Sequence, residues 1–250
     1  MEFCAFALPG MPLIQAGDDL ATLIHWAAEA YRPLQAGDVL VVSSKIVSKA
    51  EGRRVALSDV IPSAEALHYA EVTGKDPRLV ELVLRESVAV SRAGRGVLVT
   101  QHRLGFVSAN AGIDQSNVEG GDEVALLLPQ DPDTSAEKLR VSLGQLVGVP
   151  LAVVISDTHG RPFRLGNVGV AIGVAGLPAL VDMRGLPDLF GRVLKITQQG
   201  YADLIASAAH LLCGEAAEGR PVVVLRGLEL PQGAGRASDL YRPLEQDMYR

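Results

Sequence analysis

The sequence predicts an α+β protein in which mixed and antiparallel sheets pack against helices, without a Rossmann or P-loop core. Helical patterns and short apolar runs follow one another along the 250 residues without the strict alternation of a doubly wound sheet. The phosphate-loop pattern G-x-x-x-x-G-K-[ST] is absent, because Lys75 after Gly74 lacks the upstream glycine. The dinucleotide pattern G-x-G-x-x-G is absent too, since Gly169, Gly173 and Gly176 are wrongly spaced.

Amphipathic periodicity and capping residues predict the helices. Asp18 and Asp19 precede an apolar stripe from Leu20 to Tyr31, which places carboxylates at the positive end of a helix. Asp-Pro starts, a Thr-x-x-Glu capping box and a terminal Gly predict the others. These further helices are expected at 63–72, from Asp76-Pro77 to about Ser91, from Thr134 (boxed with Glu137) to about Val147, and at 200–213.

Short runs of apolar residues predict the strands. Leu151 to Ile155 is the clearest case, and we expect it to end at the polar residues Ser156, Asp157 and Thr158. The remaining strands are expected at 39–42, 97–100, 105–109, 166–173 and 221–225. We expect residues 1–250 to form a single unit, with an inserted strand-rich subdomain near 93–190.

Composition describes a globular protein, with 48% hydrophobic and 21% charged residues. No apolar stretch reaches the roughly 18 residues of a membrane span. The N-terminus lacks the pattern of a signal peptide, and Cys4 and Cys213 are not spaced as metal ligands, so we expect free thiols in a cytoplasmic protein. The net charge of -6 argues against general nucleic-acid binding, although local cations can still receive anionic substrates.

The segment after the strand at 151–155 carries the strongest functional signal. Asp157 and Thr158 follow a buried run directly, with Arg161 and Arg164 close behind. A carboxylate and a hydroxyl beside two guanidiniums suit a divalent metal with a phosphate next to it. A lone histidine on a turn is more often structural than catalytic, so we expect no catalytic role for His159.

The glycine-rich run from Gly166 to Gly173 is too rich in glycine for an ordinary strand. It predicts that another group closely approaches the backbone, and a large bound ligand is the expected one.

Two further clusters are candidates for binding. Ser44, Lys45 and Lys49 follow a strand and could face a phosphate, although a solvated basic surface is an equal alternative. Asp114 and Asn117 lie in a run rich in turn residues, and taken alone they are better explained as a turn. In the functional interpretation, Asp114 pairs with Asp157 to hold Mg²⁺ or Mn²⁺.

The loop after the last predicted helix contains Glu215 and Glu218, and a surface loop is its default interpretation. The remaining histidines lack partner spacing, and we expect no role for them: His25, His68, His102 and His210.

Taken together, the motifs resemble one family over nearly the whole chain. In order they are Gly10-Met-Pro-Leu-Ile14, Gly17-Asp-Asp-Leu20, Gly37-Asp-Val-Leu-Val-Val42, Val47-Ser-Lys-Ala-Glu-Gly-Arg53, Asn110-Ala-Gly-Ile-Asp-Gln-Ser-Asn117, Leu128-Pro-Gln-Asp-Pro-Asp133 with Ser135-Ala-Glu-Lys-Leu139, Ser156-Asp-Thr-His-Gly-Arg161, Gly169-Val-Ala-Ile-Gly173 and Asp188-Leu-Phe-Gly-Arg192. This series resembles the coenzyme F420-0:L-glutamate ligases.

The resemblance implies an amide ligase that uses GTP to add L-glutamate to coenzyme F420-0, then further glutamates through γ-linkages. It also implies Mg²⁺ or Mn²⁺, with K⁺ as a further candidate cation, and a homodimer. By position, Asp114, Asp157 and Thr158 match the family's metal-binding residues, and we expect the catalytic group to be Asp114, Asp157 and Arg161. The expected nucleotide contacts are Leu13, Ser44, Lys45, Lys49, Asn117, Gly214 and Glu215, although the loop 214–220 is less glycine-rich than the family pattern.

The chemistry of amide formation agrees with these residues. A carboxylate must be activated before an amine can attack it, and phosphoryl transfer to give an acyl phosphate achieves this. Phosphoryl transfer needs mainly positioning and charge neutralisation, which metal-held carboxylates and nearby lysines supply. Two other functions stay open at this point: a metal-dependent phosphohydrolase that uses Asp114 and Asp157, and a nucleotide- or cofactor-binding protein without catalysis.

Overall fold

A five-stranded sheet forms the centre of the protein, in a computed structural model that describes residues 2–247. The strand order is β1 (Cys4–Ala7), β12 (Val222–Arg226), β2 (Val39–Ser43), β8 (Ala152–Arg161) and β9 (Arg164–Ala175). Only β2 and β8 run parallel, and the other neighbours are antiparallel. The predicted α+β class with a mixed sheet is confirmed.

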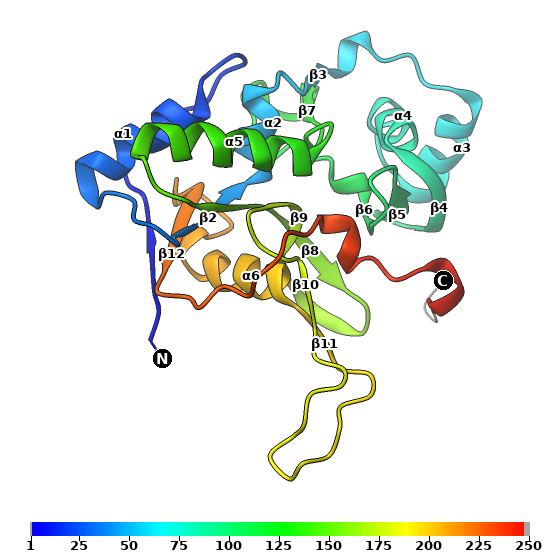
Figure 1. The fold of residues 1–250 in the computed structure, drawn as a ribbon. Helices are drawn as coiled ribbons and strands as arrows, with labels where there is room; N and C mark the ends of the chain where they lie inside the picture. Colours follow the sequence, from blue (N-terminus) through cyan, green and yellow to red (C-terminus); the bar gives the residue numbers. More distant parts are fainter. Residues whose placement is uncertain (1, 248–250) are drawn as a thin grey trace.

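Helices cover both faces of this sheet (Figure 1). Helices α1 (Leu20–Tyr31) and α5 (Pro132–Val147) pack on one face, and α6 (Tyr201–Cys213) packs on the other. Side chains alternate along β8, so Ile155 faces α1 and α5 while Val154 faces α6. Both side chains are fully buried, and each such burial contributes about 1.5–3 kcal/mol.

A third apolar cluster lies beside the central sheet, at the right of Figure 1. It is built around Leu57, Val80 and Leu98, which are buried away from both faces of the sheet. Its elements are β3 (Arg54–Ala56), α3 (Ala64–Thr73), α4 (Pro77–Arg85), β4 (Ser87–Gly94), β5 (Val97–His102), β6 (Val107–Ala109) and β7 (Val124–Leu126). The expected subdomain near 93–190 stays a prediction; β8 and β9, within that range, belong to the central sheet.

The remaining elements are short. Helix α2 (Ser44–Ala50) follows β2 directly, and β10 (Leu180–Asp182) pairs with β11 (Gln198–Gly200). The segment between them, residues 183–197, projects far from the sheet (yellow in Figure 1). Single 3₁₀ turns occur at Leu57–Asp59, Asn110–Gly112, Gly121–Glu123, Ala237–Leu240 and Leu244–Gln246. Within residues 2–247, no helix has the length and apolar character to cross a membrane.

Two predicted helix boundaries were wrong. The helix capped by Asp76 ends at Arg85 and not near Ser91, because the residues after it pair with β5 as strand β4. Helix α5 begins before Thr134: Asp131 is the cap, and its carboxylate accepts the Thr134 backbone N–H at 3.1 Å. The predicted capping box fails, since Glu137 instead binds Arg140 one turn along the helix.

The predicted end of the strand at Ile155 was also wrong. Strand β8 continues to Arg161, because β9 folds back on it and supplies partners for every residue from Ser156 onward. Asp157 and Thr158 therefore lie on a hydrogen-bonded strand and not on a loop, which holds their side chains on opposite faces.

Gly169 and Gly173 of β9 are closely approached, as predicted, but by helices, whereas no atom lies near the Cβ position of Gly166. A Cβ atom at Gly169 would overlap the His210 ring of α6, and one at Gly173 would overlap the Pro132 carbonyl of α5. A bound ligand, the expected reason for these glycines, is therefore not needed to explain them.

Gly173→Ala is expected to lower the free energy of unfolding by about 1–3 kcal/mol, since the added methyl group overpacks the contact with α5. Gly160→Ala is the matched control, because its Cβ would meet only the Asn167 side chain at 3.7 Å. Urea denaturation of the two variants checks this, and equal midpoints would contradict it.

Candidate functional site

A cavity of about 890 Å³ lies past the end of β2, beside the free edge of β8. Strand β2 pairs with β8 only as far as Ser43 and Ser156. Residues 157–161 of β8 therefore have no neighbouring strand on the side of β2. Side chains from both faces of β8 therefore reach one space. Its volume is within the range of small-molecule and cofactor sites.

The cavity gathers the predicted site residues from distant parts of the chain. Those that line it are Leu13, Ser44, Lys45, Lys49, Asp114, Asn117, Asp157, Thr158, Gly214 and Glu215. Arg161 does not line it. The Arg161 side chain lies at the end of β8, where its Nη2 donates to the Leu165 carbonyl at 3.3 Å.

Helix α2, which was not predicted, brings the two lysines together. Ser43 caps it by accepting the Lys45 backbone N–H at 3.3 Å, and Lys45 and Lys49 follow one turn apart on one face. Lys45 Nζ lies 2.7 Å from Asp114 Oδ2, and Lys49 Nζ donates to the Asn117 carbonyl at 2.8 Å. Burial, with the nearby charges of Lys45 and Arg54, lowers the pKa of Lys49. Both cations are held against the cavity wall and do not form a solvated surface.

Asp114 forms a turn and lines the cavity as well. Its carboxylate accepts the Ser116 backbone N–H at 2.7 Å, which is the turn chemistry expected of this run. Burial acts to raise the pKa of Asp114, but hydrogen bonds from Lys45 and Ser116 outweigh it and keep the pKa below its usual value. Asp114 is therefore a carboxylate at neutral pH.

Asn117 ties two walls of the cavity together. Its backbone is left-handed, with φ of 54°, a conformation that Asn tolerates better than most residues. Its Nδ2 donates to the Ala216 carbonyl at 2.9 Å, across 99 residues of sequence. The loop after α6 is thus attached to the loop that carries Asp114.

On the face of β8 toward α6, two residues that were given no site role from the sequence, Ser156 and His210, join the predicted Thr158 and Glu215. His210 Nε2 lies 3.2 Å from Ser156 Oγ, and His210 Nδ1 lies 3.3 Å from Glu215 Oε1. Glu215 also accepts the Thr158 hydroxyl at 3.2 Å. Because 54 residues separate Ser156 from His210, no local spacing could have revealed this network.

Cys213 also borders the cavity, but as an inert thiol. Burial, together with the charge of Glu215, raises its pKa to about 11. The thiol is therefore protonated at neutral pH, which argues against a nucleophilic role.

The donor set of the cavity fits a hard divalent cation. Asp114 and Asp157 offer carboxylate oxygens and Thr158 a hydroxyl. Within residues 2–247, no three His, Cys, Asp or Glu side chains group as a complete metal cage. Mg²⁺ does not need one, because it is usually held by one or two carboxylates with water and substrate phosphates.

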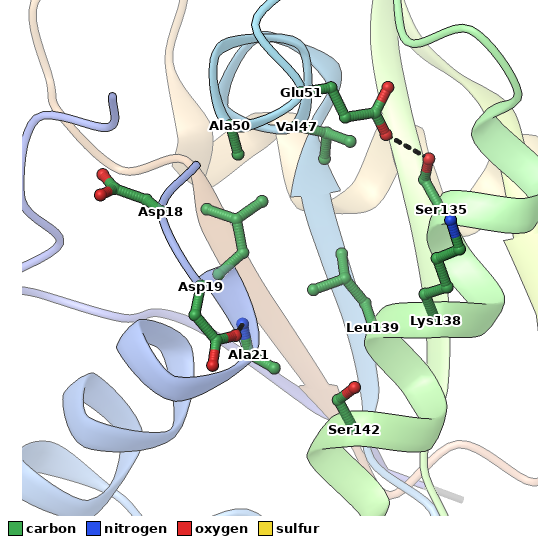
Figure 2. Close-up of a pocket in the computed structure, with 11 residues that line it drawn as sticks. Asp18, Asp19, Ala21, Val47, Ala50, Glu51, Ser135, Lys138, Leu139 and Ser142 are labelled. Carbon is green, nitrogen blue, oxygen red and sulfur yellow. Dashed lines mark hydrogen bonds between the residues drawn. The ribbon is translucent and has the colours of Figure 1, made fainter. Parts of the chain in front are cut away.

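A second hollow, of about 260 Å³, lies between α1, α2 and α5 (Figure 2). Its carboxylates already have partners: Glu51 accepts the Ser135 hydroxyl, and Asp19 caps α1 by accepting the Ala21 N–H at 3.1 Å. Because its carboxylates are already engaged in hydrogen bonds, we do not treat it as a candidate site.

Comparison with known proteins finds matches along the whole chain. A family model described as F420-0:gamma-glutamyl ligase matches residues 10–227. A Methanothermobacter thermautotrophicus protein named coenzyme F420:L-glutamate ligase is 49% identical over 255 residues, 100% of both chains. Proteins of the same name from Methanopyrus kandleri (48% over 241 residues, 95% of this chain and 93% of the relative) and Archaeoglobus fulgidus (46% over 250 residues, 100% and 97%) are similar too. The family match includes every segment that lines the large cavity.

Proposed function

The chain belongs to the F420-0:gamma-glutamyl ligase family, and on that premise we propose that it adds L-glutamate to coenzyme F420-0. The resemblance drawn from the motifs is thereby confirmed. We extend the proposal to GTP as co-substrate, to an acyl phosphate intermediate and to further γ-linked glutamates. One observation supports it most: a single cavity gathers Asp114 and Asp157 with Lys45 and Lys49, from segments far apart in the chain.

In the proposed reaction, the lactyl carboxylate of F420-0 attacks the γ-phosphorus of GTP, and GDP leaves with the bridging oxygen. The glutamate amine then attacks the acyl carbonyl, phosphate leaves, and the amine loses a proton. All reactants are anionic, so the chain must neutralise charge at the transferring phosphoryl group. Lys45 and Lys49 would do this in the proposed reaction, and both residues line the cavity.

Asp114, Asp157 and Thr158 would hold Mg²⁺ or Mn²⁺, which would supply charge neutralisation at the phosphates. Ser44 and Asn117 orient the walls: Ser44 donates to Asp157, and Asn117 holds the loop after α6. Leu13 supports nucleotide contact as an 87% exposed apolar side chain at the cavity. Because nothing ties Arg161 to this cavity, we leave it out of the proposed catalytic group.

We also propose a homodimer in the cytoplasm. Large apolar side chains are exposed to solvent on the projecting segment 183–197 and on the β8–β9 hairpin: Leu189 (99% exposed), Phe190 (89%), Ile196 (88%) and Leu165 (99%). Such a concentration of exposed apolar side chains is typical of a protein interface. Cys4 and Cys213 are free thiols, which suits a reducing compartment.

Mass spectrometry of F420-0 incubated with GTP, Mn²⁺ and L-glutamate tests the proposed function. We expect a product heavier by one or more glutamyl units, formed only when all components are present. Parallel reactions replace GTP by ATP, omit the metal, or add K⁺. GDP released equally well without glutamate, and no amide product, would overturn the ligase proposal. Phosphate released from a simple phosphoester would favour a phosphohydrolase, and metal binding without any turnover would favour a binding protein.

A further inference from the structure

Both carboxylate oxygens of Asp157 are held by other side chains. Ser44 Oγ donates to Oδ1 at 3.1 Å, and His159 Nε2 lies 3.2 Å from Oδ2. An ionised carboxylate only accepts hydrogen bonds, so the contact requires the proton on His159 Nε2. The carboxylate is thus fixed from two directions, by the start of α2 and by its own strand.

The strand itself brings His159 to Asp157. Residues two apart on a strand point to the same face, and β8 is paired with β9 at both Asp157 and His159. Had the chain formed a loop here, as the sequence led us to expect, the two side chains would have no common direction.

Phe106 holds the imidazole ring in place. Its ring centroid lies 5.0 Å from that of His159 at 51°, and the same ring also stacks on His102 at 4.9 Å and 9°. The His159 side chain is only 12% exposed. A packed ring has few alternative rotamers, so little freedom is left to the hydrogen bond.

His102, the last residue of β5, supports Phe106 by stacking on its ring. It is fully buried, and its Nε2 lies 3.6 Å from the Glu86 carboxylate, which also binds Arg53 and Arg103. Burial acts to raise the pKa of Glu86, but His102, Arg103 and Arg53 together lower it to about 2. A charged cluster around Glu86, the C-cap residue of α4, thus supports the ring that supports His159.

We propose that His159 is a positioning residue, whose Nε2–H holds the Asp157 carboxylate in the orientation that receives the divalent cation. This rests on the proposed function, since it assumes a cation at Asp157. Groups that orient metal ligands in this way typically change metal affinity by about 10–100-fold when they are removed.

The test is a titration with Mn²⁺ alone, with free Mn²⁺ measured by electron paramagnetic resonance and no turnover required. We expect His159→Leu, which keeps the apolar contact with Phe106, to weaken Mn²⁺ binding by about 10–100-fold. His159→Gln should recover much of the affinity, because its amide N–H can take the place of Nε2–H. His68→Ala, on α3 and outside the cavity, is the control, and thermal unfolding confirms that each variant is folded.

The outcomes separate this inference from the proposed function. Mn²⁺ binding that Asp157→Asn weakens strongly but His159→Leu leaves unchanged would overturn the positioning role alone. Equal loss in folded His159→Leu and His159→Gln would also overturn it, because the N–H donor would then not matter. Absence of Mn²⁺ binding by the unaltered protein would overturn the proposed metal site, and this inference with it.

Discussion

Asp157→Asn is expected to reduce glutamate ligation by more than about 100-fold, which exceeds the effect of removing a group that only orients a metal ligand. The amide keeps the size of the side chain and can still accept from Ser44, but it lacks the charge that a divalent cation requires. The measurement is the initial rate of F420-0 glutamylation at saturating GTP and glutamate, as a function of Mn²⁺ concentration. Raised Mn²⁺ should restore part of the rate.

Asp122→Asn is the matched control for this experiment. Asp122 is exposed and does not line the cavity, so its replacement should leave the rate unchanged. An Asp157→Asn variant that is as active as the unaltered protein at low Mn²⁺ would contradict the proposed metal site.

Arg226→Leu is expected to have the largest effect on stability, a loss of about 3–5 kcal/mol. Arg226, at the end of β12, binds both oxygens of Asp38, at 2.8 and 2.7 Å. Asp38 is completely buried, so loss of the guanidinium leaves a buried carboxylate without its countercharge. The Asp38 carboxylate would keep only the Gln35 backbone N–H, at 2.8 Å.

Urea denaturation measures this effect, with Arg184→Leu as the control. Arg184 and Asp182 form a similar bidentate ion pair, but both side chains are about half exposed. Surface ion pairs of this kind contribute about 0–1 kcal/mol to stability. Adding Asp38→Asn to Arg226→Leu should recover part of the lost stability, because no buried charge then remains unpaired. Equal midpoints for Arg226→Leu and Arg184→Leu would argue against the ion pair as a determinant of stability.

Elements with local signals were the predictable part of the fold. Asp19 caps α1 and Gly214 follows α6, as their sequence positions predict, because a cap acts on backbone groups within one turn. Helix α2 has a cap, Ser43, but its seven residues show no amphipathic periodicity, since its buried residues lie on several sides of the helix. The end of β8 was unpredictable for another reason: polar residues continue a strand when a partner strand pairs with them, and that partner is β9.

The same distinction between local and long-range signals holds for the candidate site. The sequence by itself determined the family and the residue types available for chemistry, among them Asp114, Asp157 and Lys49, because motifs are contiguous in the chain. Only the tertiary structure decided which side chains meet, since Ser44 and Asp157 are 113 residues apart. In the structure Arg161 does not line the cavity, and His159 lies within hydrogen-bond distance of Asp157. The physical reason is that a hydrogen bond depends on distance in space, and the pairing of β8 with β9 sets that distance.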